Sequence, residues 1–327
     1  MEVLITGGAG FLGLKLARQL LQRGSLAGKN GQQQTIQRIT LLDRVAATGL
    51  ADPRIAIKIG DVADAAVINN AVTPDVQSIF HLAAVVSGEA ESDFDLGMHI
   101  NLDATRYLLE AARKVGQCPR FIFTSSVAVF GGDLPPQVLD STAVTPQGSY
   151  GAQKAIGELL VTDYSRKGFI DGRALRVPTV SVRPGLPNKA ASSFASGIIR
   201  EPLHGKRAVC PVAPDTTMWL MSPGKAIFNL INAHEIDGNK LGATRTINLP
   251  GLSITVGDMV AALARVAGNE VVANIDWQED ADVSRLVRSW PGNFLTTRGT
   301  TLGFLKDRDF DAVIRAYISE EMEQTQA

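Results

Sequence analysis

A tyrosine and a lysine four residues apart are the side chains of this sequence best suited to move a proton. Tyr150 and Lys154 fall in a segment whose pattern predicts a helix over residues 147–167, so they share one helix face. A phenol with a pKa near ~10 is a poor base at neutral pH. An ammonium nearby favours the phenolate, which would let the pair deprotonate an alcohol. The alternative interpretation is an exposed helix pair without chemistry.

A glycine-rich turn follows the first apolar strand, residues 3–5. Gly7 permits the tight turn, Gly10 lets the backbone approach a pyrophosphate, and Gly13 allows close packing of the helix expected over residues 11–23. The start of that helix presents unpaired N–H groups to phosphates. Because the turn lies between a strand and a helix, it indicates a dinucleotide cradle rather than a plain turn.

The acidic residue that ends the next apolar strand indicates which dinucleotide binds. A carboxylate at Asp43 would accept hydrogen bonds from the adenine ribose and repel the extra phosphate of NADP. The polar segment 24–37, expected to be a surface loop, accounts for the long spacing between the glycines and Asp43. We therefore expect NAD as the cofactor. Arg44, the next residue, leaves the strictness over NADP open, and a turn-forming aspartate is the alternative.

Short apolar runs alternate with helix-length segments through the first half of the chain. The expected strands are 3–5, 38–42, 55–59, 76–81, 121–124, 173–177 and 246–249, and the expected helices are 11–23, 98–115, 147–167, 225–233 and 256–266. Such apolar strands predict a Rossmann-type α/β fold, a doubly wound parallel sheet covered by helices on both faces. We expect the NAD-binding Rossmann domain over residues 1–180, with 215–250 returning to it. A smaller C-terminal substrate-binding lobe is expected over 181–214 and 251–327.

The composition argues against several kinds of partner. The 32 basic and 33 acidic residues give a net charge of -1, without the basic surplus typical of nucleic-acid or anionic-lipid binding. Cys118 and Cys210 are the only cysteines, and the four histidines show no ligand spacing, so no protein-held metal is expected. No stretch reaches the apolar length of a membrane span and no secretion signal is visible. The sequence therefore predicts a cytoplasmic protein.

Taken together, these residues resemble the extended short-chain dehydrogenases/reductases, a family that includes sugar-nucleotide epimerases and dehydratases. The resemblance covers residues 1 to about 187 well and the remainder loosely. It rests on the cradle glycines, Asp43, Tyr150 and Lys154, and on further motifs: Gly60-Asp61-Val62, His81-Leu82-Ala83-Ala84, Asn101 and Ser125-Ser126.

The resemblance implies a role for each matching residue. Tyr150 would accept the proton, Lys154 would hold the nicotinamide ribose, and Ser126 would hydrogen-bond the reacting hydroxyl. Asn101, which matches the family's helix-borne asparagine, is counted with them as catalytic. The implied cofactor contacts are Gly7, Gly10, Phe11, Leu12, Asp43, Asp61, Val62, Leu82, Ala83, Ala84, Tyr150, Lys154 and Val177. Family members often dimerise through the helices that carry Asn101 and Tyr150, so a homodimer is expected.

Segment 216–223 bears on the substrate. Members of the family that act on sugar nucleotides usually carry an arginine and an acidic pair there, and this segment has neither. A diphosphate needs cations or many donors, so a smaller substrate is expected. Ser192 could cap a helix whose N-terminus receives a carboxylate, assisted by Asn188, Lys189 or Arg200. An ordinary capped surface helix is the alternative.

This stretch, together with residues 287–292 and 302–304, resembles a branch of the family that oxidises a small sugar acid. The resemblance implies that the hydroxyl beside the carboxylate of a four-carbon acid becomes a 2-oxo group, with hydride transfer to NAD and Tyr150 as the base. Two alternatives stay open. One is an epimerase or dehydratase that keeps its NAD and returns the hydride. The other is a non-catalytic NAD(H)-binding regulator, which would have no need of Ser126, Tyr150 and Lys154.

Overall fold

The computed structural model describes residues 1–186 and 190–322. Within these residues the chain divides into two compact units. Unit 1 comprises Met1–Val129, Gly148–Arg176 and Ile227–Ile247, and unit 2 comprises Phe130–Gln147, Val177–Ala226 and Asn248–Ala327.

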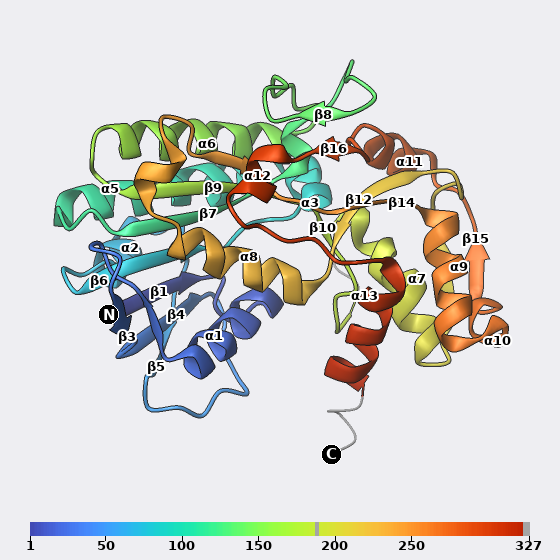
Figure 1. The fold of residues 1–327 in the computed structure, drawn as a ribbon, viewed down its shortest axis with the longest axis horizontal. Coiled ribbons are helices and arrows are strands. Elements are labelled where there is room, and N and C mark those ends of the chain that lie inside the picture. The colour runs from blue at the N-terminus through green and yellow to red at the C-terminus, as the bar shows by residue number, and fades with distance from the viewer. Residues whose placement is uncertain (187–189, 323–327) are drawn as a thin grey trace. The chain divides into compact units, whose positions relative to one another are not determined.

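Unit 1 is built on a sheet to which the described residues contribute seven strands, in the order β13-β9-β7-β6-β1-β4-β5 (Figure 1). These strands are β1 (Glu2–Thr6), β4 (Arg38–Asp43), β5 (Ile55–Ile59), β6 (Val76–His81), β7 (Arg120–Ser126), β9 (Asp171–Val177) and β13 (Thr246–Asn248). From β5 through β4, β1 and β6 to β7, each strand runs parallel to its neighbour. The strand order reverses between β1 and β6, which confirms the predicted doubly wound Rossmann-type sheet.

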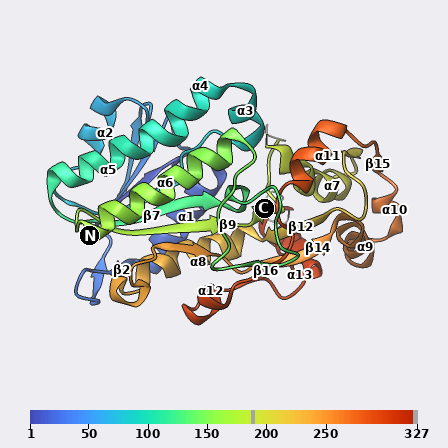
Figure 2. The same ribbon diagram turned by 90° about the horizontal axis from the view of Figure 1, so that it is seen from above.

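Helices cover both faces of this sheet (Figures 1 and 2). One face carries α1 (Phe11–Arg23) and α8 (Pro223–Glu235), and the other carries α2 (Ala65–Ala71), α5 (Ala104–Val115) and α6 (Ser149–Arg166). Apolar residues at helical spacing face the strands and form a continuous core with them, among them Ile68, Leu108, Leu109, Val161, Ile79, Phe121 and Phe123. Burial of these helix faces against the strands therefore fixes where α6 lies on the sheet.

Three segments of unit 1 differ from the sequence-based expectation. The expected surface loop 24–37 contains an antiparallel hairpin of β2 (Ser25–Ala27) and β3 (Gln33–Thr35). Each strand has only three residues and β3 is polar, so neither gave a strand pattern. The expected helix 98–115 is α5 preceded by α4 (Phe94–Gly97) and a π-helix, Met98–Asp103. The strand expected over 121–124 continues to Ser126.

Unit 2 has a hydrophobic core of its own, which includes Phe194, Ile198, Leu220, Met259 and Phe310. In this unit β12 (Thr217–Met221) pairs in parallel with β10 (Thr179–Val180) and antiparallel with β14 (Leu252–Thr255). The sequence placed all of 215–250 with the Rossmann domain. Because β12 pairs with β10 and β14, residues 217–221 belong to unit 2, whereas Ile227–Ile247 does belong to unit 1.

The remaining elements are short or lie in unit 2. The helices are α3 (Ser87–Ser92), α7 (Phe194–Leu203), α9 (Val256–Ala267), α10 (Asn269–Val272), α11 (Ala281–Arg288), α12 (Thr297–Thr301) and α13 (Phe310–Tyr317), with 3-10 turns at Val127–Val129, Ala191–Ser193 and Gly238–Leu241 and a π-helix at Ile318–Met322. The strands are β8 (Val138–Leu139), β11 (Ala208–Cys210), β15 (Ile275–Trp277) and β16 (Phe294–Leu295).

Two kinds of feature are absent from the described residues. None of their helices combines the length and apolar character needed to cross a membrane. No group of three or more His, Cys, Asp or Glu side chains in the same ranges is arranged to hold a metal ion. The absence of a metal and the cytoplasmic location stay predictions.

Candidate functional site

The glycine-rich turn after β1 is packed too tightly for side chains. Gly7 has a φ of +69°, and a Cβ on it would lie 2.8 Å from the backbone nitrogen of Ala83. A Cβ on Gly13 would lie 2.2 Å from the carbonyl oxygen of Gly7. Gly10 is the N-cap of α1 and supplies no side-chain hydrogen bond, so the first N–H groups of the helix keep no side-chain partner there. This cradle fits a pyrophosphate at the reversal point of the sheet.

The carboxylate of Asp43 lies against this cradle. It accepts hydrogen bonds from the N–H of Ala9 at 3.0 Å and from the N–H of Arg44 at 2.7 Å. The exposed Arg44 has its Nε 4.0 Å from Oδ2 of Asp61, whose Oδ1 accepts from the N–H of Ala63 at 2.9 Å. Asp43 and Asp61 thus stand side by side at the carboxyl ends of β4 and β5, where the adenosine half of a dinucleotide held by the cradle would lie.

The other predicted cofactor contacts fall on the loops around the cradle. Phe11 and Leu12 open α1, and Val62 is buried after β5. Leu82, Ala83 and Ala84 form the loop after β6, in which the N–H of Ala83 approaches Oγ1 of Thr6 at 3.3 Å. Val177 ends β9. Their contacts with NAD stay predictions.

A buried histidine connects β1, β6 and α5. His81 is 1% exposed, with Nδ1 2.7 Å from Oγ1 of Thr6 and Nε2 2.9 Å from Oγ1 of Thr105. The Thr105 hydroxyl already donates to the carbonyl of Asn101 at 2.7 Å, so its oxygen must accept a proton from Nε2 of His81. The ring is therefore neutral with its proton on Nε2, and burial, followed by the charge of Lys154, lowers the pKa of His81 to about 3.

Asn101 joins the loop after β6 to α6. Its Oδ1 accepts the N–H of Val85 at 2.9 Å, and its Nδ2 donates to the Val85 carbonyl at 3.1 Å and to Oε1 of Gln153 at 2.7 Å. The side chain is 1% exposed. These contacts connect Val85, the residue after Ala84, to Gln153 on α6, and the catalytic role of Asn101 stays a prediction.

Tyr150 and Lys154 lie on one face of α6, as their spacing predicted. The Lys154 Nζ is 5.7 Å from the centre of the Tyr150 ring and 4.8 Å from the centre of the Phe123 ring on β7. Gly157 makes this possible, because a Cβ on it would lie 2.6 Å from Cζ of Phe123. The helix can therefore approach β7 closely, and the lysine lies over an aromatic face beside the half-buried phenol.

Burial changes the acidity of this lysine. Lys154 is 2% exposed, and burial lowers its pKa to about 7, against which the nearby Glu158 raises it. Any charge or hydrogen-bond acceptor that reaches a buried ammonium of this kind changes its pKa. Ribose hydroxyls at Lys154 would provide such acceptors, as the resemblance implied.

An acidic residue that sequence reasoning missed anchors the same helix. Glu158 lies one turn beyond Lys154 and is 4% exposed. Its carboxylate accepts from Nε and Nη2 of Arg176 at 2.9 and 2.7 Å, and from the Ser125 hydroxyl at 2.5 Å. This group ties α6 to the strand that ends in Ser126 and to the strand that ends in Val177. The signal was its spacing, since Glu158 continues the four-residue period of Tyr150 and Lys154.

Ser126 is the last residue of β7, next to the anchored Ser125. Its Oγ accepts the N–H of Ala128 at 3.1 Å and so begins the 3-10 turn Val127–Val129. Both β7 and this turn pack against α6. The structure therefore brings the predicted serine to the strand end that the Tyr150 helix covers, at the carboxyl edge of the sheet.

The residues predicted to contact the substrate have different surroundings. Asn188 lies outside the described residues. Ser192 is in the 3-10 turn before α7, where Ser193 occupies the N-cap position without a side-chain hydrogen bond, so Ser192 is not the predicted helix cap. Arg200 is 5% exposed, and its guanidinium donates to Glu201 at 2.5 and 3.0 Å and to the Arg183 carbonyl at 2.7 Å. These contacts hold Arg200 inside unit 2, and the substrate contacts of all three stay predictions.

Comparison with known proteins gives consistent results. The model of the NAD dependent epimerase/dehydratase family matches residues 3–230. A protein named D-erythronate dehydrogenase from Cupriavidus necator is 59% identical over 320 residues, which cover 98% of each chain. A second protein of that name, from Haemophilus influenzae, is 45% identical over 98% of this chain and 100% of its own.

Solved structures share the whole fold. A crystal structure titled nucleoside-diphosphate-sugar epimerase, from Agrobacterium tumefaciens, has a TM-score of 0.92 and 43% identity, covering 99% of this chain and 95% of that one. L-threonine 3-dehydrogenase from Trypanosoma brucei has a TM-score of 0.85 over 97% of this chain and 96% of its own. Its identity is 24%, so this second likeness concerns the fold alone.

Proposed function

The chain belongs to the NAD dependent epimerase/dehydratase family, and from this premise we propose that it oxidises the 2-hydroxyl of D-erythronate to the 2-oxo acid with NAD. The observation that carries the proposal is the pair on α6, with the buried Lys154 ammonium 5.7 Å from the Tyr150 ring at the carboxyl edge of the sheet. The names of the two full-length relatives support the substrate.

Each catalytic residue would have a separate task. The Tyr150 oxygen would take the proton of the substrate hydroxyl, and the Ser126 hydroxyl would hydrogen-bond the same oxygen. Lys154 would favour the phenolate and hold the nicotinamide ribose. Bound NAD supplies the acceptor for the hydride that leaves carbon 2, so the substrate loses one proton and one hydride and becomes the 2-oxo acid.

The chain would hold NAD through groups that its backbone already orients. The cradle formed by Gly7, Gly10 and the start of α1 would bind the pyrophosphate. Asp43 would accept from the adenine ribose hydroxyls, and its negative charge would oppose the 2′-phosphate of NADP. The substrate carboxylate would be held by unit 2, for which Ser192 and Asn188 are the candidates from the sequence.

The epimerase title of the Agrobacterium structure raises the second candidate, an enzyme that returns the hydride to a sugar nucleotide. Segment 216–223 argues against it. Residues 217–221 of that segment form β12, and the segment lacks the arginine and the acidic pair that would offset a diphosphate. A regulator without activity is disfavoured because Tyr150 and Lys154 are both in place.

One assay separates these functions. Purified protein with free NAD should form NADH in proportion to added D-erythronate, measured by absorbance. Tyr150→Phe should lower kcat by at least about 100-fold while NAD binding stays within a few-fold, because only the proton acceptor is lost. Tyr164→Phe is the matched control, since Tyr164 lies on the same helix and hydrogen-bonds Glu110 instead. Wild-type protein that binds NAD but forms no NADH would refute the dehydrogenase proposal.

We further propose that the protein is a homodimer through the outer faces of α5 and α6. Phe94, Ile156 and Leu159 are 59%, 39% and 70% exposed, and α4 and α6 pack together, so apolar side chains gather on this surface. Leu159→Asp should give monomers in light scattering after size exclusion, whereas Leu305→Asp, which changes an exposed leucine of unit 2, should not. A wild-type monomer at micromolar concentration would contradict the proposal.

A further inference from the structure

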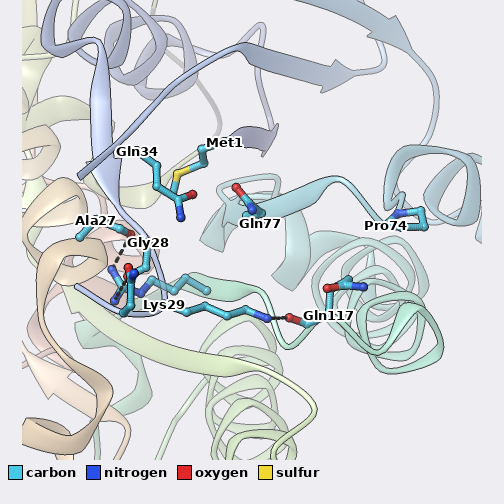
Figure 3. Close-up of a pocket in the computed structure, with 10 residues that line it drawn as sticks. Met1, Ala27, Gly28, Lys29, Gln34, Pro74, Gln77 and Gln117 are labelled. Carbon is cyan, nitrogen blue, oxygen red and sulfur yellow. Dashed lines mark hydrogen bonds between the residues drawn. The ribbon is translucent and has the colours of Figure 1, made fainter. Parts of the chain in front are cut away.

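Unit 1 contains a cavity at the edge of the sheet opposite the glycine cradle. It encloses about 330 Å³. Its walls come from the start of β1, β6 and β7 and from the turn of the hairpin β2–β3, and its lining consists of Met1, Ala27, Gly28, Lys29, Asn30, Gln34, Pro74, Gln77, Gln117 and Arg120. Figure 3 shows Lys29 and Gln117 along one side and Met1, Gln34 and Gln77 along the other. The cradle lies where β1 and β6 end, whereas this cavity lies where they begin, so the two are separate sites.

The charge of the lining has one sign. Among the described lining residues, the charged side chains are Lys29 and Arg120, and no acid is present. Four carboxamides supply the other polar side chains: Asn30, Gln34, Gln77 and Gln117. Lys29 reaches across to donate to the Gln117 carbonyl (Figure 3). A cavity of this size lined by cations and amide donors has the chemistry of an oxyanion site.

Arg120 is buried and incompletely paired. It is 5% exposed, and it donates to the carbonyls of Ala27, Gly28 and His234 at 2.6 to 3.1 Å. Its Nε has no hydrogen-bond partner among the described residues, and lies 3.6 Å from the nearest carboxylate oxygen, on Asp171. Because Nε is itself closed off from solvent and is ion-paired with Asp171, Arg120 contributes the positive charge of its guanidinium, rather than an open N–H, to the cavity that it lines.

The charges behind the cavity wall are also mostly positive. Asp171 is shared by three guanidiniums, with Arg173 and Arg245 at 2.7 and 3.0 Å in addition to Arg120. Arg173 is fully buried. One carboxylate therefore faces three arginines, and Lys29 adds a further positive charge at the cavity. Buried charges are normally paired, and an anion in the cavity would offset the surplus.

We propose that this cavity binds a small oxyanion, a phosphate or a carboxylate group, held by Lys29, Arg120 and the carboxamides. Because of where the cavity lies, the bound anion would stabilise the structure of unit 1. It would link the β2–β3 hairpin to the start of β7, the strand that carries Phe123, Ser125 and Ser126 at its other end. The site is independent of the proposed oxidation, so its test does not depend on that activity.

Thermal unfolding with inorganic phosphate tests the site. The protein is saturated with NADH so that the glycine cradle is filled, and phosphate replaces chloride at constant ionic strength. Wild type should show a saturable rise in Tm of roughly 2 °C. Lys29→Gln should abolish the rise because it removes a cation. Gln77→Glu should abolish it independently because it places a negative charge on the opposite wall.

Lys58→Gln is the matched control. Lys58 also donates its Nζ to a backbone carbonyl, that of Asn70, at 2.6 Å, but it does not line the cavity. This variant should keep the full phosphate response. A parallel titration with malonate distinguishes a phosphate ligand from a carboxylate ligand. A rise in Tm with phosphate alone assigns a phosphate site, and an equal rise with malonate assigns a general oxyanion site. An equal rise in wild type, Lys29→Gln and Gln77→Glu, or no rise in wild type, would overturn the proposal.

Discussion

The Glu158 carboxylate and the Arg176 guanidinium form a buried, two-point ion pair, with Nε and Nη2 of Arg176 at 2.9 and 2.7 Å from its oxygens. The pair joins α6, one turn beyond Lys154, to the last residues of β9. Since the Ser125 hydroxyl also donates to Glu158, three elements of the site meet at one carboxylate. The pair therefore helps to fix the position of the helix that carries Tyr150 and Lys154.

Breaking this pair on one side should be costly. Glu158→Gln should lower the free energy of unfolding by about 3–5 kcal/mol, because it removes the carboxylate charge that accepts two hydrogen bonds from a buried guanidinium. In a separate cycle, the double variant Glu158→Leu/Arg176→Met should lose much less than the sum of the losses of Glu158→Leu and Arg176→Met. Urea unfolding of the four proteins measures the coupling.

An exposed pair on the same helix is the control. Arg166 donates to Asp163 at 2.6 Å, and both side chains are more than half exposed. Asp163→Asn should cost at most about 1 kcal/mol because water screens the pair. Equal losses in the free energy of unfolding at the two sites would show that the buried Glu158–Arg176 pair contributes no more to stability than an exposed pair.

Removing the Lys154 ammonium should stabilise the protein while it stops catalysis. Since the folded pKa is about 7 and the unfolded value about 10.5, the unfolded state binds more protons between these values, and wild-type stability rises as the pH increases through this range. Lys154→Met has no such dependence. Its gain in stability over wild type should therefore be largest below pH 7 and shrink towards pH 10.5. Denaturant unfolding of the cofactor-free proteins across that range measures it, and a gain that grew with pH would contradict the assignment.

Asp43 should control the choice between NAD and NADP. Asp43→Asn removes the negative charge and weakens two hydrogen bonds from the Ala9 and Arg44 amides. The KM for NAD should rise roughly tenfold, and the preference for NAD over NADP should fall by at least that factor. Adding Arg44→Gln should take back any gain with NADP, because the cation next to the ribose is lost. Unchanged preference in Asp43→Asn would place the ribose elsewhere.

Two buried histidines should make the fold sensitive to acid. Burial lowers the pKa of His81 to about 3 and that of His234 to about 4. As the pH falls below 6.5 the unfolded chain protonates both residues while the folded chain does not, so stability falls by up to about 2.7 kcal/mol per pH unit from these groups. In His234→Gln the decrease in the free energy of unfolding between pH 6 and 5 should be smaller by about half that amount. The exposed His99→Gln should leave it unchanged, as urea unfolding at several pH values would show.

Sequence patterns predicted the elements that bury apolar faces. Residues 11–23 form a helix as predicted, because Leu16 and Leu20 repeat at helical spacing and Gly24 ends it with a φ of +73°. The hairpin over residues 25–35 was missed, since its strands are only three residues long and the second carries polar side chains. The π-helix before α5 was missed as well, because its backbone departs from α-helical hydrogen bonding without a change in composition.

What the sequence alone determined is the local chemistry: glycines where a backbone must turn and approach phosphate, an acid at the end of a strand, and a phenol one turn from an ammonium. These follow from residue type and short spacing. Only the tertiary structure decided which polar groups become buried partners. The pairing of Glu158 with Arg176, the contacts of the His81 ring, and those of Asp171 with Arg120 and Arg245 all join residues from different elements. Burial sets the strength of those interactions, and burial is a property of the packed chain rather than of any segment of it.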